Sequence, residues 1–212
     1  MFSDPIWWIA LLSGILALGF LGGLMVNRRL GRQLYRTLRQ ALEAYGTVAQ
    51  ARWLGGATSG VYLSLHEARP PLRRLEAVVL LEPREFLPVW LVARWVRGQR
   101  DALILRVVFR RTPHTEWEWR TQGRLGLRGF SPPGPDEGFE SVTAPGFRGW
   151  VRPRQEPEAV TSWHEFLGKY GGRLLALSLR KRKPHLILAV KVRGLDVATF
   201  LEDLLVAVEP WL

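Results

Sequence analysis

Residues 5–26 read PIWWIALLSGILALGFLGGLMV and contain no charged side chain. An α-helix over residues 6–26 is roughly 30 Å long at about 1.5 Å per residue, which matches the hydrocarbon core of a bilayer. Trp7 and Trp8 lie near its beginning, where indole rings favour the headgroup level. Asn27-Arg28-Arg29 ends the apolar run abruptly. We therefore expect a transmembrane anchor over residues 1–27.

Two alternatives to an anchor fit the sequence less well. A cleaved signal peptide carries Lys or Arg before its apolar region and a small-residue cleavage site after it. Here Asp4 is the only charged residue before the run, and no A-x-A site follows. A buried helix of a globular protein rarely stays uncharged for so long. Arginines follow the run, so the positive-inside rule predicts an outside N-terminus and a cytoplasmic remainder at the cell membrane.

Gly19 and Gly23 form a G-x-x-x-G pattern inside the apolar run. In a bilayer this spacing lets two helices approach closely, so one expectation is a homodimer through these glycines. Glycine is frequent in membrane helices in general, which is the alternative explanation.

Residues 28–46 have the spacing of a basic amphipathic helix next to the membrane. Leucines at positions 30, 34, 38 and 42 fall on one side of a helix with Ala41 and Tyr45, and Gly46 suits its end. The leucine face is expected to contact the lipid interface, a protein partner or the protein's own sheet. The opposite face carries Glu43 and five arginines: Arg28, Arg29, Arg32, Arg36 and Arg39. Anionic lipid headgroups attract each such arginine by roughly 1 kcal/mol.

The remaining residues, 47–212, predict a cytoplasmic α+β domain built on an antiparallel sheet. The glycine-rich segment at residues 55–60 predicts a turn. It is not interpreted as a phosphate-binding loop, because the lysine of that motif is missing. Helices are expected over residues 86–97 and 158–170, and a last one begins after Asp196, a good N-cap. Residues 131–158 are rich in Pro and Gly and predict a surface excursion with short strands at 139–143 and 147–151. Further strands are expected at residues 61–66, 75–81, 102–110, 115–121, 173–180 and 186–193.

Two of these segments carry more specific expectations. Apolar residues surround the axis of helix 86–97, which favours a core helix, with insertion into the bilayer surface as the alternative. In strand 115–121, Glu116 and Glu118 alternate with Trp117 and Trp119, so the acids are expected to face solvent.

Two similar turns suggest an internal repeat. Helix, strand, turn and strand follow one another around residues 86–121 and again around 158–193, and both turns carry basic residues followed by Pro-His. This predicts a duplicated α-β-β unit, with chance similarity of turn residues as the alternative. The turns would gather positive charge for an anionic ligand; their candidate residues are Arg110, Arg111, His114, Lys181, Arg182, Lys183 and His185.

The composition limits the possible chemistry. Thirty Lys and Arg against 19 Asp and Glu give a net charge of +11, and the absence of Cys excludes disulfides and cysteine nucleophiles. His164-Glu165 begins a zinc-binding H-E-x-x-H pattern, but position 168 is Gly. The sequence has no recognised catalytic, RNP or KH motif, so we expect no metal and no cofactor, and enzymatic activity is disfavoured.

These observations predict a membrane-anchored cytoplasmic interaction or scaffold domain. Its expected partners are the bilayer, anionic lipid headgroups and another protein. Two alternatives remain open at this point: a membrane-tethered nucleic-acid-binding module that uses the basic turns, and an enzyme with a site that no motif reveals.

Overall fold

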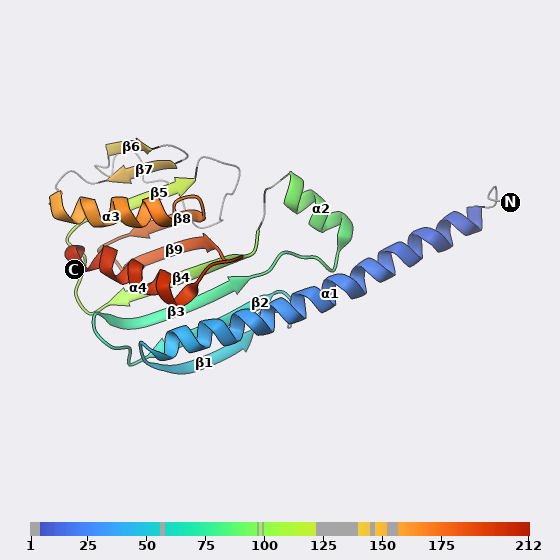
Figure 1. Cartoon of the computed structure of the whole chain (residues 1–212), viewed down its shortest axis with the longest axis horizontal. Helices are drawn as coiled ribbons and strands as arrows, with labels where there is room; N and C mark the ends of the chain where they lie inside the picture. The colour runs from blue at the N-terminus through green and yellow to red at the C-terminus, as the bar shows by residue number, and fades with distance from the viewer. Residues whose placement is uncertain are drawn as a thin grey trace.

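One long helix dominates the computed structural model, which describes residues 5–55, 58–96, 98, 100–121, 140–144, 147–151 and 157–212. Helix α1 (Pro5–Glu43) is continuous over 39 residues and projects far beyond the rest of the molecule (Figure 1). The expected basic helix at 28–46 is therefore not a separate element but the second half of α1. No bend separates the apolar run from the arginines, because residues 26–30 keep the helical conformation.

An antiparallel sheet forms the body of the described part of the chain. Its nine strands lie in the order β1-β2-β3-β4-β9-β8-β5-β7-β6. The fold is thus α+β, as expected. The strands are β1 (Thr47–Trp53), β2 (Gly60–His66), β3 (Leu72–Leu80), β4 (Ala102–Phe109), β5 (Trp117–Thr121), β6 (Glu140–Ala144), β7 (Phe147–Val151), β8 (Leu174–Leu179) and β9 (Leu186–Lys191).

Three helices cover one face of this sheet. Helices α3 (Pro157–Tyr170) and α4 (Val197–Val208) lie beside the C-terminal half of α1, and the three run side by side in Figure 1. The leucine face of α1 packs here against its own domain: Leu38 and Leu42 are fully buried in the same core as Phe200 and Leu63. Of the three expected contacts for this face, the protein's own sheet is the one that the structure contains.

The predicted hairpin between residues 102–110 and 115–121 is wrong. Strand β4 pairs with β9, and β5 pairs with β8, so the β8–β9 hairpin lies between them. Residues 110–114 therefore cross the end of the sheet instead of forming a tight turn. The two proposed repeats also differ in their helices, because α3 covers the sheet and the helix at 87–95 does not (Figure 1). The structure does not show a duplicated α-β-β unit.

The core position predicted for the helix at 86–97 is also wrong. The helix is shorter, α2 (Leu87–Trp95), and Ala93 is its only buried residue. It lies beyond the end of the sheet, beside the projecting part of α1 (Figure 1). Its continuous apolar sequence is typical of a buried helix, but here most of that surface is open.

Most other predicted elements are confirmed. Asp196 caps α4, accepting from the N–H of Ala198 at 3.2 Å, and both strands expected within residues 131–158 exist as β6 and β7. The rest of that excursion lies mainly outside the described residues. Strand β1 was not predicted; it is an exposed edge strand with weak alternation. The solvent-facing position predicted for Glu118 is wrong, because this side chain is buried beside Arg180.

Replacing Leu42 tests how firmly α1 is joined to the domain. Leu42→Ala removes a fully buried side chain and is expected to cost about 2–5 kcal/mol of unfolding free energy. Leu18→Ala is the matched control, because Leu18 is 73% exposed on the same helix. Thermal unfolding of the purified protein in detergent measures both. Equal melting temperatures for the two variants would contradict the packing described here.

Candidate functional site

A cluster of buried and half-buried polar groups lies beside α1 where its apolar run ends. We call Asn27, Glu82, Arg84, Glu85 and Asp101 the polar junction. Asn27 is fully buried and is the only asparagine in the chain. Its Nδ2 donates to the carbonyl oxygens of Glu82 at 2.8 Å and Thr58 at 3.1 Å, and to Glu85 Oε2 at 2.9 Å. The amide therefore joins α1 to two loops that are distant in sequence.

Arg84 completes the polar junction from the other side. Its guanidinium donates to Asn27 Oδ1 at 2.9 Å and makes two bonds to Asp101, at 2.9 and 2.6 Å. Burial acts to lower the pKa of Arg84, but the hydrogen bond and negative charge of Asp101 outweigh it, so the pKa is raised. The ion pair between Arg84 and Asp101 compensates the cost of removing both groups from water, which makes burial of the pair tolerable.

Glu82 ties α2 to the same cluster. Its Oε2 accepts from Trp90 Nε1 at 2.5 Å and from Arg94 Nη1 at 3.2 Å. The Arg94 guanidinium also lies over the Trp90 ring, 5.4 Å from its centroid. Glu82, which precedes α2, and Arg94, near the end of α2, are thus paired with each other, and α2 is held beside α1.

The glycine pattern of α1 is used within the chain. A Cβ at Gly19 would overlap the Leu87 side chain, and one at Gly23 would overlap the backbone of Arg84 and Glu85. Small residues at these positions let the segment before α2 approach the helix closely. The face expected to form a homodimer is therefore covered by residues 84–87 of the same chain.

The arginines after Asn27 form an exposed basic surface, which we call the arginine face. Arg28, Arg29, Arg32 and Arg36 are exposed, whereas Arg39 pairs with Glu43 at 2.8 Å. The hydrogen bond to Glu43, with a second one to Tyr35, raises the pKa of Arg39. A groove of about 480 Å³ runs from this face to the loop after β9, where it is lined by Arg29, Arg84, Asp101 and Arg193.

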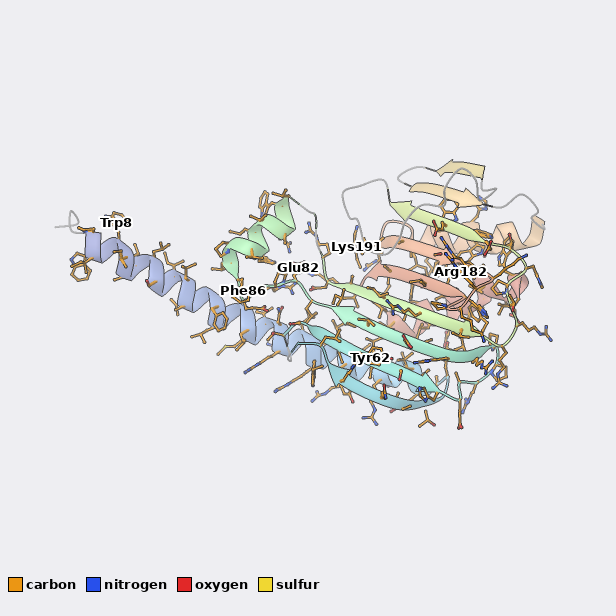
Figure 2. All side chains as sticks on the ribbon, turned by 180° about the vertical axis from the view of Figure 1, so that it is seen from behind. Trp8, Tyr62, Glu82, Phe86, Arg182 and Lys191 are labelled. Carbon is orange, nitrogen blue, oxygen red and sulfur yellow. The ribbon has the colours of Figure 1, made fainter. Side chains whose placement is uncertain are left out.

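The two basic turns meet at the opposite end of the sheet. Strand β4 ends beside the start of β9, so residues 110–114 lie next to residues 181–185. We call the exposed members of this group the distal basic end: Arg110, Arg111, His114, Lys181, Arg182 and Lys183. Figure 2 shows Arg182 and Trp8 at opposite ends of the molecule. The distal basic end therefore lies far from the start of α1.

Two candidate residues of the basic turns, His185 and Arg110, have structural roles. His185 is buried, stacks on Phe109, and its Nδ1 accepts the backbone N–H of Phe109 at 3.1 Å. Burial lowers the pKa of His185, and the nearby Lys183 lowers it further, which favours the neutral ring that this bond needs. Arg110 donates to the carbonyl oxygens of Leu72 and Ala68. Neither side chain is free to serve mainly as a ligand contact.

The carboxylates of Glu116, just before β5, and Glu118, within it, are occupied as well. Glu118 pairs with Arg180, and Glu116 accepts the backbone N–H of Lys181 at 3.1 Å. Among the residues that the structure describes, no group of three or more His, Asp or Glu side chains is arranged to hold a metal ion.

The sequence analysis missed the polar junction except for Asn27, which it treated only as the end of the apolar run. Two signals point to it: a lone asparagine directly after a membrane-length run, and the charged segment Glu82-Pro83-Arg84-Glu85 directly before an apolar helix. The partnership between them could not be predicted, because 55 residues separate Asn27 from Glu82.

Replacing Asn27 tests the polar junction. Asn27→Ala leaves one N–H of the Arg84 guanidinium without its acceptor and the carbonyl oxygens of Glu82 and Thr58 without their donor. Each polar group left unsatisfied in this way costs about 1–3 kcal/mol. We expect a clear drop in melting temperature in detergent, whereas Gln33→Ala, at an exposed position on α1, leaves it unchanged. An Asn27→Ala protein as stable as the Gln33→Ala control would show that the polar junction does not hold these elements together.

Comparison with known proteins does not identify a function for the chain. No protein family and no curated protein matches the chain. The described part of the chain has three surfaces that could contact other molecules: an exposed apolar helix, the arginine face next to it, and the distal basic end.

Proposed function

We propose that the protein is a single-pass membrane protein whose first helical half spans the bilayer and whose α+β domain is held at the cytoplasmic surface. One observation carries this proposal. The most apolar 18-residue window of α1 is only 6% buried, although the other end of the same helix lies in the domain core. An apolar surface of this length, left uncovered by the chain's own fold, suits the hydrocarbon core of a bilayer.

The continuity of α1 supports an anchor over the two alternatives. A core helix of a soluble domain would be mostly buried, which this window is not. A cleaved signal sequence would leave the helix interrupted between the apolar run and the domain. Instead, the helix passes through that point, and Asn27 and Leu38 tie its second half into the domain.

The arginine face supports the proposed orientation and the contact with lipid. Four exposed arginines follow the end of the apolar run within about three helical turns. In the proposed orientation they lie at the headgroups of the cytoplasmic leaflet, which attract each of them by about 1 kcal/mol when the lipid is anionic. In this proposal they hold the domain close to the membrane and select anionic lipid.

The domain itself is proposed to be an interaction or scaffold module. The helices α1, α3 and α4 cover one face of the sheet, while Tyr62 and Lys191 lie on the other face (Figure 2). The buried charges of the described residues are paired with one another, as in Arg84–Asp101 and Arg180–Glu118. This pairing gives them a structural explanation and leaves surface recognition as the activity that the geometry supports best.

A second candidate is a membrane-tethered nucleic-acid-binding module. The convergence of the two basic turns favours it, because Arg111, Lys181, Arg182 and Lys183 are exposed together at the end of the domain away from the apolar half of α1. A phosphate backbone in the cytoplasm could reach this end without meeting the bilayer.

The membrane topology provides the test of the first proposal. The chain has no cysteine, so single cysteines can report exposure. We expect Val206→Cys, on the exposed side of α4, to react with a membrane-impermeant maleimide only after cells are permeabilised. Ser3→Cys, before the apolar run, is expected to react in intact cells. Labelling of Val206→Cys in intact cells, or release of the protein by alkaline carbonate, would contradict the proposal.

Salt dependence separates the second candidate from the first. If the distal basic end binds nucleic acid, affinity for RNA or DNA falls steeply with salt, and the combined change of Arg111, Lys181, Arg182 and Lys183 to Gln abolishes most of it. Neutralising four arginines of α1 (Arg28, Arg29, Arg32 and Arg36) is the charge-matched control. Equal loss in both variants would show binding by net charge alone and would reject this candidate.

A further inference from the structure

Helix α2 has an apolar surface that the chain does not cover. Phe86, Val89 and Val92 are 53–56% exposed, and Trp95 is 82% exposed. Apolar area left in water costs about 25 cal/mol per Å², and contiguous exposed patches of this kind mark an interface. The surface therefore requires an explanation that the fold of the domain does not supply.

The position of this apolar surface along α1 indicates which medium surrounds it. Leu87 lies against Gly19, and the Phe86 ring meets Phe20 edge-on with centroids 6.1 Å apart. Gly19 precedes Asn27 by eight residues, which corresponds to roughly 12 Å along a helix. If residues 5–26 span the bilayer, the start of α2 is thus inside the hydrocarbon layer on the side of the domain.

Two ion pairs near α2 suit a low-dielectric environment, and the neighbouring Glu85 accepts a hydrogen bond from Asn27 Nδ2. Arg94 is paired with Glu82, whose carboxylate also accepts the Trp90 N–H. Arg84 is paired with Asp101. Unpaired charges would carry a large desolvation cost at this depth, whereas these groups are already neutralised in pairs. The arginine face, which lies further along α1, is left exposed.

We propose that α2 is a second membrane-contacting element, inserted beside α1 into the leaflet on the side of the domain. This inference rests on the proposed role of α1 as a membrane span. Nine residues are too few to cross the bilayer, so α2 enters only part of one leaflet. Two contact points in place of one fix the tilt and rotation of the domain on the membrane.

Lipid chains are the occupant that fits this surface. A protein partner or a second copy would cover one side of α2, leaving a polar side towards water. Exposed apolar side chains instead occur at successive positions of the helix, including Leu91, Val92, Trp95 and Val96, and so surround most of it. A fluid apolar solvent covers such a helix from several directions at once.

Fluorescence quenching in bilayer nanodiscs tests this inference on the full chain. A bimane label is placed on Val92→Cys, on Leu18→Cys in α1, and on Val206→Cys in α4; these positions are all exposed, and the last is a valine matched to the first. Lipids with nitroxide on the acyl chain report contact with hydrocarbon, and iodide reports contact with water. We expect the labels at positions 92 and 18 to lose most of their emission to the nitroxide, and the label at 206 only to iodide.

Each other outcome has a definite meaning. Quenching of the label at 92 by iodide, with position 18 quenched by lipid, overturns the insertion of α2 but leaves the anchor intact. Protection of position 92 from both quenchers places a protein, such as a second copy, on α2 and also overturns the inference. Failure of lipid to quench position 18 rejects the membrane span itself, and with it the proposed function.

Discussion

The structure depends on one helix that has two different surroundings along its length. The first half of α1 exposes almost all of its apolar side chains, while the second half buries Leu38 and Leu42 in the domain core. Between them lies Asn27, whose amide is bonded on both its oxygen and its nitrogen to the loops that carry β3 into α2 and β1 into β2. A rigid helix fixed in this way transmits the position of its apolar half directly to the sheet.

The exposed positive charge of the chain includes two separate groups. The net charge of +11 is not spread evenly: exposed arginines gather beside the end of the apolar run, and a second basic group gathers at the far end of the sheet. In the proposed orientation, the first group meets lipid headgroups and the second faces away from the membrane. By contrast, Arg84, Arg94 and Arg180 are paired with buried carboxylates.

Local periodicity predicted the elements whose surroundings are uniform. Helix α4 and the leucine face of α1 repeat with the period of a helix against a single core, and the capping residue Asp196 marks a boundary. Pairing across the sheet was beyond this reasoning, since Pro-His after basic residues looked like the same turn twice. In fact Pro113 lies within the crossover from β4 to β5, whereas Pro184 lies in the β8–β9 turn.

The same limit explains the errors at α2 and Glu118. An apolar helix has the same sequence pattern whether or not the domain core covers it, and only the contact of Leu87 with Gly19 shows that α2 lies beside the projecting part of α1. Glu118 alternates with tryptophans as a solvent-facing residue would, but Arg180 from the neighbouring strand end neutralises it in the interior. In both cases the deciding partner is distant in sequence, and residue spacing carries no information about it.

A distance measurement by electron spin resonance tests the rigid continuity of α1 most directly. Spin labels on Leu18→Cys and Val206→Cys report the separation between the apolar half of α1 and the domain in bilayer nanodiscs. The account predicts one narrow distance distribution, which broadens when Asn27→Ala is added. A broad distribution in the protein with Asn27 intact would show that the helix bends freely at the membrane surface and would contradict the account.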